Sequence, residues 1–496
     1  MATTLSLTAL ENLPAPVEAP GYDRSNLSPG ILHIGVGNFH RAHMAYYLDR
    51  LFALGEGQDW ALVGAGVRPG DQVMRDRLEG QDWLTTLIEL DPKGLNARVI
   101  GSMIDFTPID PAAVIAAMSN PEIRIVSLTI TEGGYYVDAK TDGFDATHPD
   151  MAHDASHPDA PRSVFGMILA ALRNRRLAGL APFTVLSCDN LPENGHVCAR
   201  TVIGLAGLSD ADLAQWVDRN VAFPNSMVDC ITPATSDRER ALVRDRFGVR
   251  DDAVVVCEPF RQWVLEDNFP QGRPPLEQVG AQFVADVGKY ELMKLRILNG
   301  GHAAIAYPSA LLGHHFVHEA MADPQIAAWL RAVESHEIIP TLAPINGVSF
   351  ASYLNKIVER FANPEIGDTI ARLCLDGSNR QPKFILPTLA ERLHNDATID
   401  GLAQEVAFWC RYCEGTDETG NAIAPNDDNH RMLRDLALES RRDPLAFLNN
   451  PAVFGNLADN PRFREKFAAR LRFVQEHGTY AAIADYLQLT KTTAAT

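Results

Sequence analysis

The stretch that most constrains the fold is ILHIGVGNFHRAHMAYYLDRL, which begins at Ile31. An apolar strand leads into a glycine turn and a helix follows at once, which predicts the first unit of a dinucleotide-binding fold. Gly35 gives the tight turn, and Gly37 lets the backbone approach a pyrophosphate. His40 stands where the fingerprint has a third glycine, so an ordinary strand-turn-helix is an alternative interpretation.

Further residues near this turn and after the next strand are candidates for cofactor binding. Asn38 and Phe39 lie in the turn, and Arg41 can add positive charge for a phosphate. The next apolar run, WALVGAG, is expected to be the second strand, and VRPGD follows it. An acidic side chain there binds the ribose 2′-hydroxyl and repels a 2′-phosphate. Asp71 therefore favours NAD, whereas Arg68 leaves NADP open.

Polar residues follow several other apolar runs. IRIVSLTITEGGYY carries Glu132, FTVLSCDNLPENG carries Asn190, and FPNSMVDCITP carries Asp229. Because ligands of doubly wound sheets bind at the carboxyl ends of the strands, we expect these residues at the functional edge. Glu132 is a candidate cofactor-side or proton-relay residue, and its alternative role is to cap the following turn.

The pattern of the chain changes near residue 285, after which helical stretches follow one another. We predict a Rossmann-like, doubly wound α/β domain over 1–285 and a mostly α-helical substrate and catalytic domain over 286–496. We expect the active site between these halves, since clefts often form between domains.

The first helix of the second half, YELMKLRILNGGHAAIAYPSALLG, holds Lys294, Asn299 and His302 at close spacing. On an ideal helix Glu291, Lys294 and His302 fall within about 80° of one another, but Asn299 lies about 140° from Lys294. A distortion is needed to bring Asn299 to the same face. We expect the Gly-Gly pair that follows to supply it, because glycine reaches backbone angles closed to other residues.

These side chains suit alcohol oxidation without a metal. Burial makes a Lys lose its proton more easily, so Lys294 can act as a general base. The amide of Asn299 can hold an oxygen on which negative charge develops, and His302 can orient a neighbouring hydroxyl. The alternative is a buried helix whose Lys reaches solvent and whose Asn is a cap.

Composition excludes several classes of function. The net charge, 44 − 63 = −19, argues against non-specific binding to nucleic acid or anionic membranes. No run of about 18 apolar residues indicates a membrane span, and the start has no signal-peptide pattern. Seven cysteines then indicate reduced thiols and a cytoplasmic location. We expect no metal site, and we expect a monomer.

Several segments together resemble the polyol-specific long-chain dehydrogenase family. They are GVGNFHRAH, SLTITEGGYY, SCDNLPENG, FPNSMVDCITP, CEPFRQWVLED, KLRILNGGHA and DGSNRQPKF. The resemblance implies a zinc-free, NAD-dependent and reversible oxidation of D-mannitol to D-fructose, with a polyol or ketose as the small-molecule substrate.

The resemblance also implies roles for individual residues. Lys294 matches the general base, Asn190 and Asn299 match the oxyanion hole, and His302 matches a substrate-binding residue. Glu291 matches a residue linked to proton exchange with solvent. The positions that match polyol-lining residues are Asp229, Arg372 and Arg380.

Three alternatives remain open. A hexuronate reductase of the same family, acting on fructuronate or tagaturonate, would need a cationic clamp for its substrate, which Arg372 or Arg380 can provide. An arabinitol or sorbitol dehydrogenase is a second alternative. An NAD(H)-binding sensor without catalysis is the third, although binding alone would need no buried amine.

Overall fold

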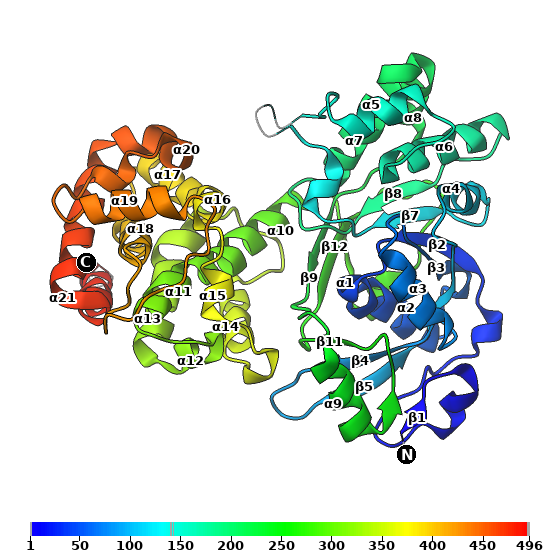
Figure 1. Cartoon of the computed structure of the whole chain (residues 1–496), viewed down its shortest axis with the longest axis horizontal. Helices are drawn as coiled ribbons and strands as arrows, with labels where there is room; N and C mark the ends of the chain where they lie inside the picture. Colours follow the sequence, from blue (N-terminus) through cyan, green and yellow to red (C-terminus); the bar gives the residue numbers. More distant parts are fainter. Residues whose placement is uncertain (1, 139–140, 142, 494–496) are drawn as a thin grey trace. The chain divides into compact units, whose positions relative to one another are not determined.

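The computed structural model describes residues 2–138, 141 and 143–493. The chain divides into two compact units, Met1–Gly288 and Lys289–Thr496, which we call unit 1 and unit 2. Unit 1 combines strands and helices, and the described part of unit 2 is built from helices (Figure 1). None of the described helices combines the length and the apolar composition that crossing a membrane requires.

A five-stranded parallel sheet forms the centre of unit 1, in the order β6-β3-β2-β7-β8. Its strands are β2 (Pro29–Ile34), β3 (Ala61–Ala65), β6 (Met103–Phe106), β7 (Ile125–Leu128) and β8 (Thr184–Ser187). Counted along the chain this order is 3-2-1-4-5, which is the order of a dinucleotide-binding sheet. The predicted doubly wound fold is therefore confirmed.

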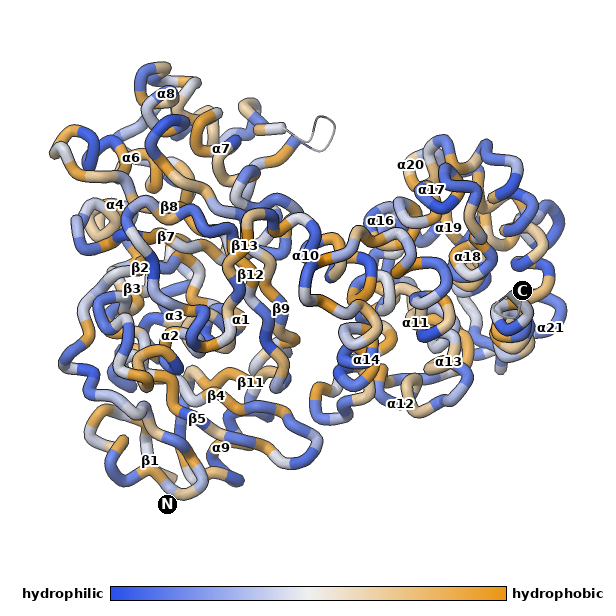
Figure 2. The backbone as a smooth tube through the Cα atoms, turned by 180° about the vertical axis from the view of Figure 1, so that it is seen from behind, coloured by the Kyte–Doolittle hydropathy of each residue, from blue (hydrophilic) through white to orange (hydrophobic). Residues whose placement is uncertain are grey.

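Both faces of this sheet are buried, as its apolar strands require. Ile31 and Leu186 face one hydrophobic core, whereas Leu32, Val126 and Val185 face the other. Much of the tube along these strands has the orange colour of apolar residues in Figure 2. The helices that follow the strands are α1 (Asn38–Ala42), α2 (Met44–Ala53), α3 (Asp71–Glu79), α4 (Pro111–Ser119), α6 (Val164–Leu177) and α7 (Asn194–Ser209).

Smaller sheets complete unit 1. One has the order β11-β4-β5 and another the order β13-β12-β9, while β1 pairs with β10. Their bounds are β1 (Thr3–Thr4), β4 (Thr85–Glu89), β5 (Asn96–Ile100), β9 (Ser226–Asp229), β10 (Val249–Arg250), β11 (Val255–Cys257), β12 (Gln262–Glu266) and β13 (Gln282–Val284). The other α-helices are α5 (Pro149–Ser156), α8 (Ala211–Asn220) and α9 (Asp237–Phe247).

The boundary between the units falls at the start of a helix in three parts, namely α10 (Gly288–Met293), the π-helix η6 (Lys294–Asn299) and α11 (Gly300–Leu311). A second π-helix, η7 (Glu334–Ile338), continues α13. The other helices are α12 (Val317–Ala322), α13 (Pro324–Val333), α14 (Phe350–Phe361), α15 (Ile370–Leu373), α16 (Gly377–Phe384), α17 (Leu386–His394), α18 (Asp400–Cys413), α19 (His430–Glu439), α20 (Pro451–Phe454) and α21 (Pro461–Thr493).

The core of unit 2 lies around α18, which packs against α11 and α21. The apolar stripe of α21 is buried at Phe463, Phe467, Leu471 and Val474. Gly478 breaks α21 with a φ of 82°, which is a conformation that glycine adopts readily.

The core of unit 2 also contains a buried carboxyl group, that of Glu405 on α18. Its Oε1 accepts a hydrogen bond of 2.6 Å from Nε2 of Gln381 on α16. Burial raises the pKa of Glu405 to about 8. Because a Glu in an unfolded chain has a pKa of about 4.3, the folded state holds this proton more tightly than the unfolded state does. The resulting loss of stability begins near pH 4.3 and grows as the pH rises through about 8.

We expect Glu405→Gln to make the protein less sensitive to alkaline pH. The amide keeps an acceptor for Gln381 but has no proton to lose. The melting temperature of the wild type should therefore fall more between pH 6 and pH 9 than that of E405Q. The difference should correspond to a free energy of unfolding on the order of a few kcal/mol. Glu439→Gln, at an exposed position of α19, is the control. Equal pH dependence of E405Q and wild type would contradict the prediction.

Candidate active site

The two glycines of the turn after β2 differ in what they have to accommodate. Gly35 has a φ of 96°, and a Cβ placed on it would lie 2.1 Å from the carbonyl oxygen of Thr129. Gly37 has an ordinary φ of −87°, and the nearest heavy atom to its Cβ position is Gly35 O at 3.9 Å. The folding of the chain thus requires the first glycine. The second leaves open space beside the helix start, and this space suits the close approach of a cofactor pyrophosphate.

His40 occupies the position of the absent third glycine. Its ring stacks on that of His33 in β2, with ring centroids 3.4 Å apart and planes 14° apart. His33 also contacts Ser127 Oγ at 2.8 Å and Thr129 Oγ1 at 2.9 Å. Burial lowers the pKa of His33 to about 3. A neutral imidazole therefore joins β2 to β7 and to the residue that follows β7. The sequence did not single out His33, although a polar residue inside an apolar strand is the feature that could have indicated this contact.

Arg41 is turned into the protein and is 2% exposed. Its guanidinium group donates to Gly37 O at 3.3 Å, to Asn38 Oδ1 at 2.7 Å and to Ala253 O. We expected this charge to face a phosphate, but three protein oxygens already hold it. Arg41 instead braces the turn. The Asn38 amide nitrogen lies 3.3 Å from Thr235 Oγ1.

Asp71 lies at the first position of α3 and closes the turn after β3. Its Oδ2 accepts from the backbone N–H groups of Val67 at 2.8 Å and Arg68 at 2.9 Å. The side chain is half-buried, and Arg68 is exposed.

At the glycine turn after β2, the half-buried Phe39 ring stacks on His43, with ring centroids 4.8 Å apart.

Asp189 joins the loops that follow β7 and β8. Its carboxylate accepts from the backbone N–H groups of Ile130 at 2.8 Å and Thr131 at 2.9 Å, and from the Tyr135 hydroxyl at 2.6 Å. Thr131 has a φ of 67°, a strained conformation of the kind that clusters at functional sites. Its neighbour Glu132 is exposed at the start of the 3₁₀-helix η4 (Glu132–Tyr135).

The exposed Asn190 follows Asp189, and two other asparagines fix this loop to β9. Asn194 Nδ2 donates to Asp189 O at 3.0 Å and to Ser226 O at 2.8 Å. Asn225 Oδ1 accepts from the N–H groups at 195 and 196, at 2.9 and 3.2 Å. Asp229, at the end of β9, is 3% exposed. The sequence did not single out Asn194, because the bonds it makes join segments far apart in the chain.

The helix that carries Lys294 is distorted before its glycines, and the glycines themselves are helical. Residues Lys294–Asn299 form the π-helix η6, in which Gly300 N–H bonds to the carbonyl oxygen of Leu295. Gly300 has helical angles, φ −61° and ψ −42°. The expectation that the Gly-Gly pair supplies the distortion was therefore wrong. A π turn bonds residue i to i+5, so it brings Asn299 towards the face of Lys294.

The residues of this helix differ in how deeply they are buried, and the π turn sets which of them reach the surface. Glu291, Lys294, Asn299 and His302 are all half-buried, whereas Arg296, Ile297 and Leu298 are buried. The imidazole of His302 stacks on Phe361 of α14, with ring centroids 4.1 Å apart and planes 14° apart. The amine, the amide, the imidazole and the carboxyl group thus lie on one half-buried stripe of a helix whose other side is in the core, and Glu291 Oε1 and His302 Nε2 are themselves buried.

Arg372 and Arg380 lie close together at the end of α15. The guanidinium group of Arg372 forms a two-pronged ion pair with Asp368. Arg380 Nη1 donates to the carbonyl oxygens of Arg372 and Leu373, both at 3.1 Å. Both cations are therefore already engaged by oxygens of unit 2.

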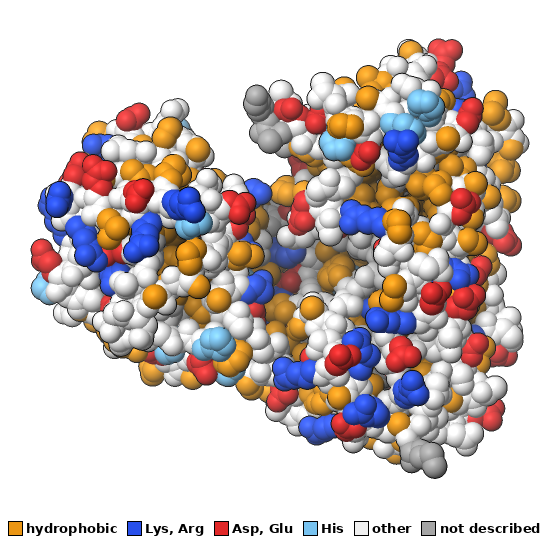
Figure 3. All heavy atoms as spheres, viewed as in Figure 1, with side chains coloured by type: hydrophobic (Ala, Val, Ile, Leu, Met, Phe, Trp, Pro, Cys, Tyr) orange, Lys and Arg blue, Asp and Glu red, His pale blue; other side chains and the backbone are white. Residues whose placement is uncertain are grey.

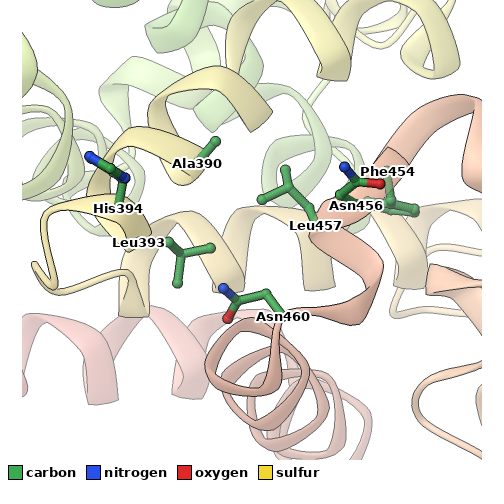
Figure 4. A pocket seen from close by; sticks show the side chains of 7 residues that line it. All are labelled: Ala390, Leu393, His394, Phe454, Asn456, Leu457 and Asn460. Carbon is green, nitrogen blue, oxygen red and sulfur yellow. The ribbon is translucent and has the colours of Figure 1, made fainter.

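Other features of the described residues lie outside this set of side chains. A hollow of about 390 Å³ lies between α17 and the 454–460 segment, with His394, Asn456 and Asn460 in its walls (Figure 4). On the face of unit 1 drawn in Figure 3, acidic and basic side chains are interspersed. Cys410 is buried in α18, and Cys413 is half-buried there. Among the described residues no group of His, Cys, Asp or Glu is arranged to hold a metal ion.

Comparison with known proteins places both units in one family. Residues 29–278 match the mannitol dehydrogenase Rossmann domain, and residues 286–475 match the mannitol dehydrogenase C-terminal domain. The mannitol 2-dehydrogenase of Cereibacter sphaeroides is 57% identical over 473 residues, which are 95% of this chain and 99% of that protein. A mannitol dehydrogenase of Saccharomyces cerevisiae is 42% identical over 491 residues, or 98% of each chain.

Two solved structures are also similar over nearly the whole chain. A ternary complex of Pseudomonas fluorescens mannitol 2-dehydrogenase with NAD and D-mannitol has a TM-score of 0.84 and 42% identity, covering 98% of this chain and 100% of that one. A substrate-free D-sorbitol dehydrogenase has a TM-score of 0.89 and 35% identity, covering 97% and 100%. With a dinucleotide-binding unit followed by a helical unit, both matched by dehydrogenase family domains, the chain is a two-domain dehydrogenase. Within that class, the chain belongs to the mannitol dehydrogenase family.

Proposed function

We propose that this chain is an NAD-dependent mannitol 2-dehydrogenase, which interconverts D-mannitol and D-fructose. The observation that carries the proposal is the 57% identity to a mannitol 2-dehydrogenase over 95% of the chain. The structure similar to it at a TM-score of 0.84 is a complex with NAD and D-mannitol. The open space at Gly37 and the stripe of Glu291, Lys294, Asn299 and His302 support the same function.

NAD, when bound, supplies the hydride acceptor of the reaction. Lys294, as a neutral amine, accepts the proton of the C2 hydroxyl group. The amide N–H groups of Asn190 and Asn299 donate hydrogen bonds to the oxygen as negative charge develops on it. A lone pair of that oxygen then completes the carbonyl group of the ketose as the C2–H bond breaks and its hydrogen leaves with the bonding electron pair, as hydride. In ketose reduction the ammonium group of Lys294 returns the proton.

The remaining residues bind substrate and move protons. His302 orients a neighbouring hydroxyl group, and its stacking on Phe361 fixes the plane of the imidazole. Glu291, one turn before Lys294, exchanges the proton with solvent. Asp229, Arg372 and Arg380 bind the other polyol hydroxyl groups, which need both donors and acceptors.

The cofactor site is proposed at the carboxyl ends of the central sheet. Gly35 and Gly37 shape the turn that receives the pyrophosphate. Asn38, Phe39 and the inward-facing Arg41 hold this turn in place. Asp71 uses Oδ2 to hold the turn after β3, and its carboxylate reads the ribose 2′-hydroxyl. Glu132 is exposed at the end of β7, on the cofactor side.

A substrate panel tests the proposal. Mannitol, arabinitol, sorbitol, fructose and fructuronate are each assayed with NAD(H) and with NADP(H) by the absorbance of the reduced nicotinamide. The expected result is oxidation of mannitol with NAD and reduction of fructose with NADH. Brisk fructuronate reduction without oxidation of any polyol would instead indicate a hexuronate reductase. Binding of NADH without any turnover would indicate a sensor.

One specific observation favours a second polyol over a sugar acid. The similarity to a D-sorbitol dehydrogenase, at 35% identity, keeps sorbitol as the next candidate substrate. A carboxylate substrate needs a free cationic clamp. Both prongs of Arg372 are engaged by Asp368, and Arg380 donates to two backbone carbonyls. The ion pair with Asp368 neutralises the charge of Arg372, which disfavours a carboxylate substrate. Nη1 of Arg372 lies outside that pair and can still donate to a neutral polyol hydroxyl group.

A further inference from the structure

Glu334 is a buried carboxyl group that the proposed mechanism does not use. It is the first residue of η7 and its exposed fraction is 0%. Within the described part of the chain neither of its carboxyl oxygens has a hydrogen-bond partner. Burial raises the pKa of Glu334 well above its usual value, so the group is a neutral acid. A buried polar group without a partner costs about 1–3 kcal/mol of stability, so its presence needs a reason.

Glu334 lies directly against the helix that carries the proposed catalytic residues. A Cβ placed on Gly301 would be 3.2 Å from Glu334 Oε1, 3.4 Å from Leu330 Cδ1 and 3.7 Å from Phe361 Cε2. A Cβ on Gly300 would be 3.8 Å from Ile338 Cδ1, at the other end of η7. The two glycines therefore allow the π-helix η7 to approach the first turn of α11 closely.

The same contacts reach His302. Phe361 lies beside the Gly301 position that Glu334 also contacts, and its ring carries the His302 imidazole on one face. Gly301 is joined to His302 by a peptide bond. The Glu334 carboxyl group is thus connected to His302 by two sets of contacts, one through the backbone at Gly301 and one through the Phe361 ring.

We propose that Glu334 is a positioning residue for polyol binding, which acts on His302 through Gly301 and Phe361. Its carboxyl group, which lies against Gly301, donates a hydrogen bond to a backbone carbonyl group of the turn from Asn299 to His302 once the polyol is bound. The inference rests on the function proposed above. In the free protein the unpartnered acid lowers the stability of the fold. In the complex it gains a hydrogen-bond partner, so the free energy recovered there adds to the affinity for the polyol. Natural proteins commonly accept such a cost at functional sites.

The test compares Glu334→Met with Glu334→Gln. Methionine is linear, apolar and close to glutamate in length, so it fills the same space without a polar group. Glutamine keeps a neutral donor. We expect E334M to melt at a higher temperature than wild type, to have a KM for mannitol about tenfold higher or more, and to change little in kcat and in NADH affinity. E334Q should retain a KM near that of wild type.

Ligand-induced stabilisation gives a second measurement. NADH together with D-mannitol is a pair that cannot react, and it should raise the melting temperature of wild type more than that of E334M. A merely structural role predicts the opposite order of stability for the free proteins. An E334M chain that is less stable than wild type, or that does not fold, would therefore overturn the proposal.

Failure of the inference can be told from failure of the proposed function. Active wild type with an E334M variant of unchanged KM and unchanged ligand stabilisation would overturn the role of Glu334 alone. Wild type that oxidises no polyol would overturn the proposed function, and this inference with it.

Discussion

Lys294→Ala should lower the rate of mannitol oxidation by about 10²–10⁴-fold, because a general base contributes a factor of this size. Lys294 lies on the half-buried stripe of α10, η6 and α11 with Glu291, Asn299 and His302. If it accepts the C2 hydroxyl proton, its loss leaves the oxygen without an acceptor in either direction of the reaction. Steady-state kinetics of mannitol oxidation and fructose reduction give the measurement.

The control is Lys289→Ala, which removes an exposed lysine from the same helix. K289A should keep the rate of wild type, and both variants should bind NADH equally, since neither residue is proposed to contact the cofactor. A K294A variant that keeps more than about a tenth of the wild-type rate would contradict the role of the amine.

Chemical rescue separates a missing base from a damaged fold. Small primary amines added to K294A can enter the space that the side chain leaves and accept the proton. The rate should rise with amine concentration and with the basicity of the amine. The acidic limb of the pH profile for oxidation, which reports protonation of the base, should be flattened in K294A. A rate that does not respond to amines, together with a wild-type pH profile, would exclude Lys294 as the base.

The fold of unit 1 could be predicted because its signals are local. Apolar runs such as ILHI and ALVG are each followed by a glycine or polar turn and a helix. This alternation of strands and helices is compatible with only a few sheet topologies. The helical character of unit 2 was equally visible in its periodicity. These patterns depend only on residues that are close together in the sequence, so they can be recognised without a structure.

The site was predictable in its residue types and less so in its geometry. The rotation of about 100° per residue correctly indicated that Asn299 needs a distortion to join Lys294. It did not locate that distortion, because a shift from i+4 to i+5 bonding leaves no mark in composition. Glycine normally signals unusual φ angles, but Gly300 has helical angles and packs near Ile338 and Phe384.

Contacts between distant segments were beyond reach from the sequence. Arg41 was expected to face a phosphate, since its position near a helix start is all that the sequence shows. The acceptor that turns it inward, Ala253 O, lies 212 residues later. Asp189 and Glu334 likewise act on segments that only the folded chain brings near. Buried polar groups are thus where the structure adds most to the sequence.

Gly35→Ala and Gly37→Ala should separate the requirements of the fold from those of the cofactor. In G35A the new methyl group would lie 2.1 Å from Thr129 O, at a φ of 96° that costs alanine about 1–2 kcal/mol even without the clash. We expect a chain that is insoluble or melts at a much lower temperature. In G37A the methyl group meets only Gly35 O at 3.9 Å, at an ordinary φ. This variant should fold with nearly the wild-type melting temperature.

Since the free protein has room for a side chain at position 37, any loss caused by a larger residue there is expected to come from what binds beside it. If the pyrophosphate approaches this backbone, a methyl group should weaken NADH binding by tenfold or more, and Gly37→Val should weaken it further. Titration of NADH fluorescence measures the affinity, and thermal unfolding without ligand measures the fold. We expect kcat at saturating NAD to change less than the KM for the cofactor, which would identify the defect as one of cofactor binding. G37V with wild-type NADH affinity would place the pyrophosphate elsewhere and remove the main structural support for the cofactor site.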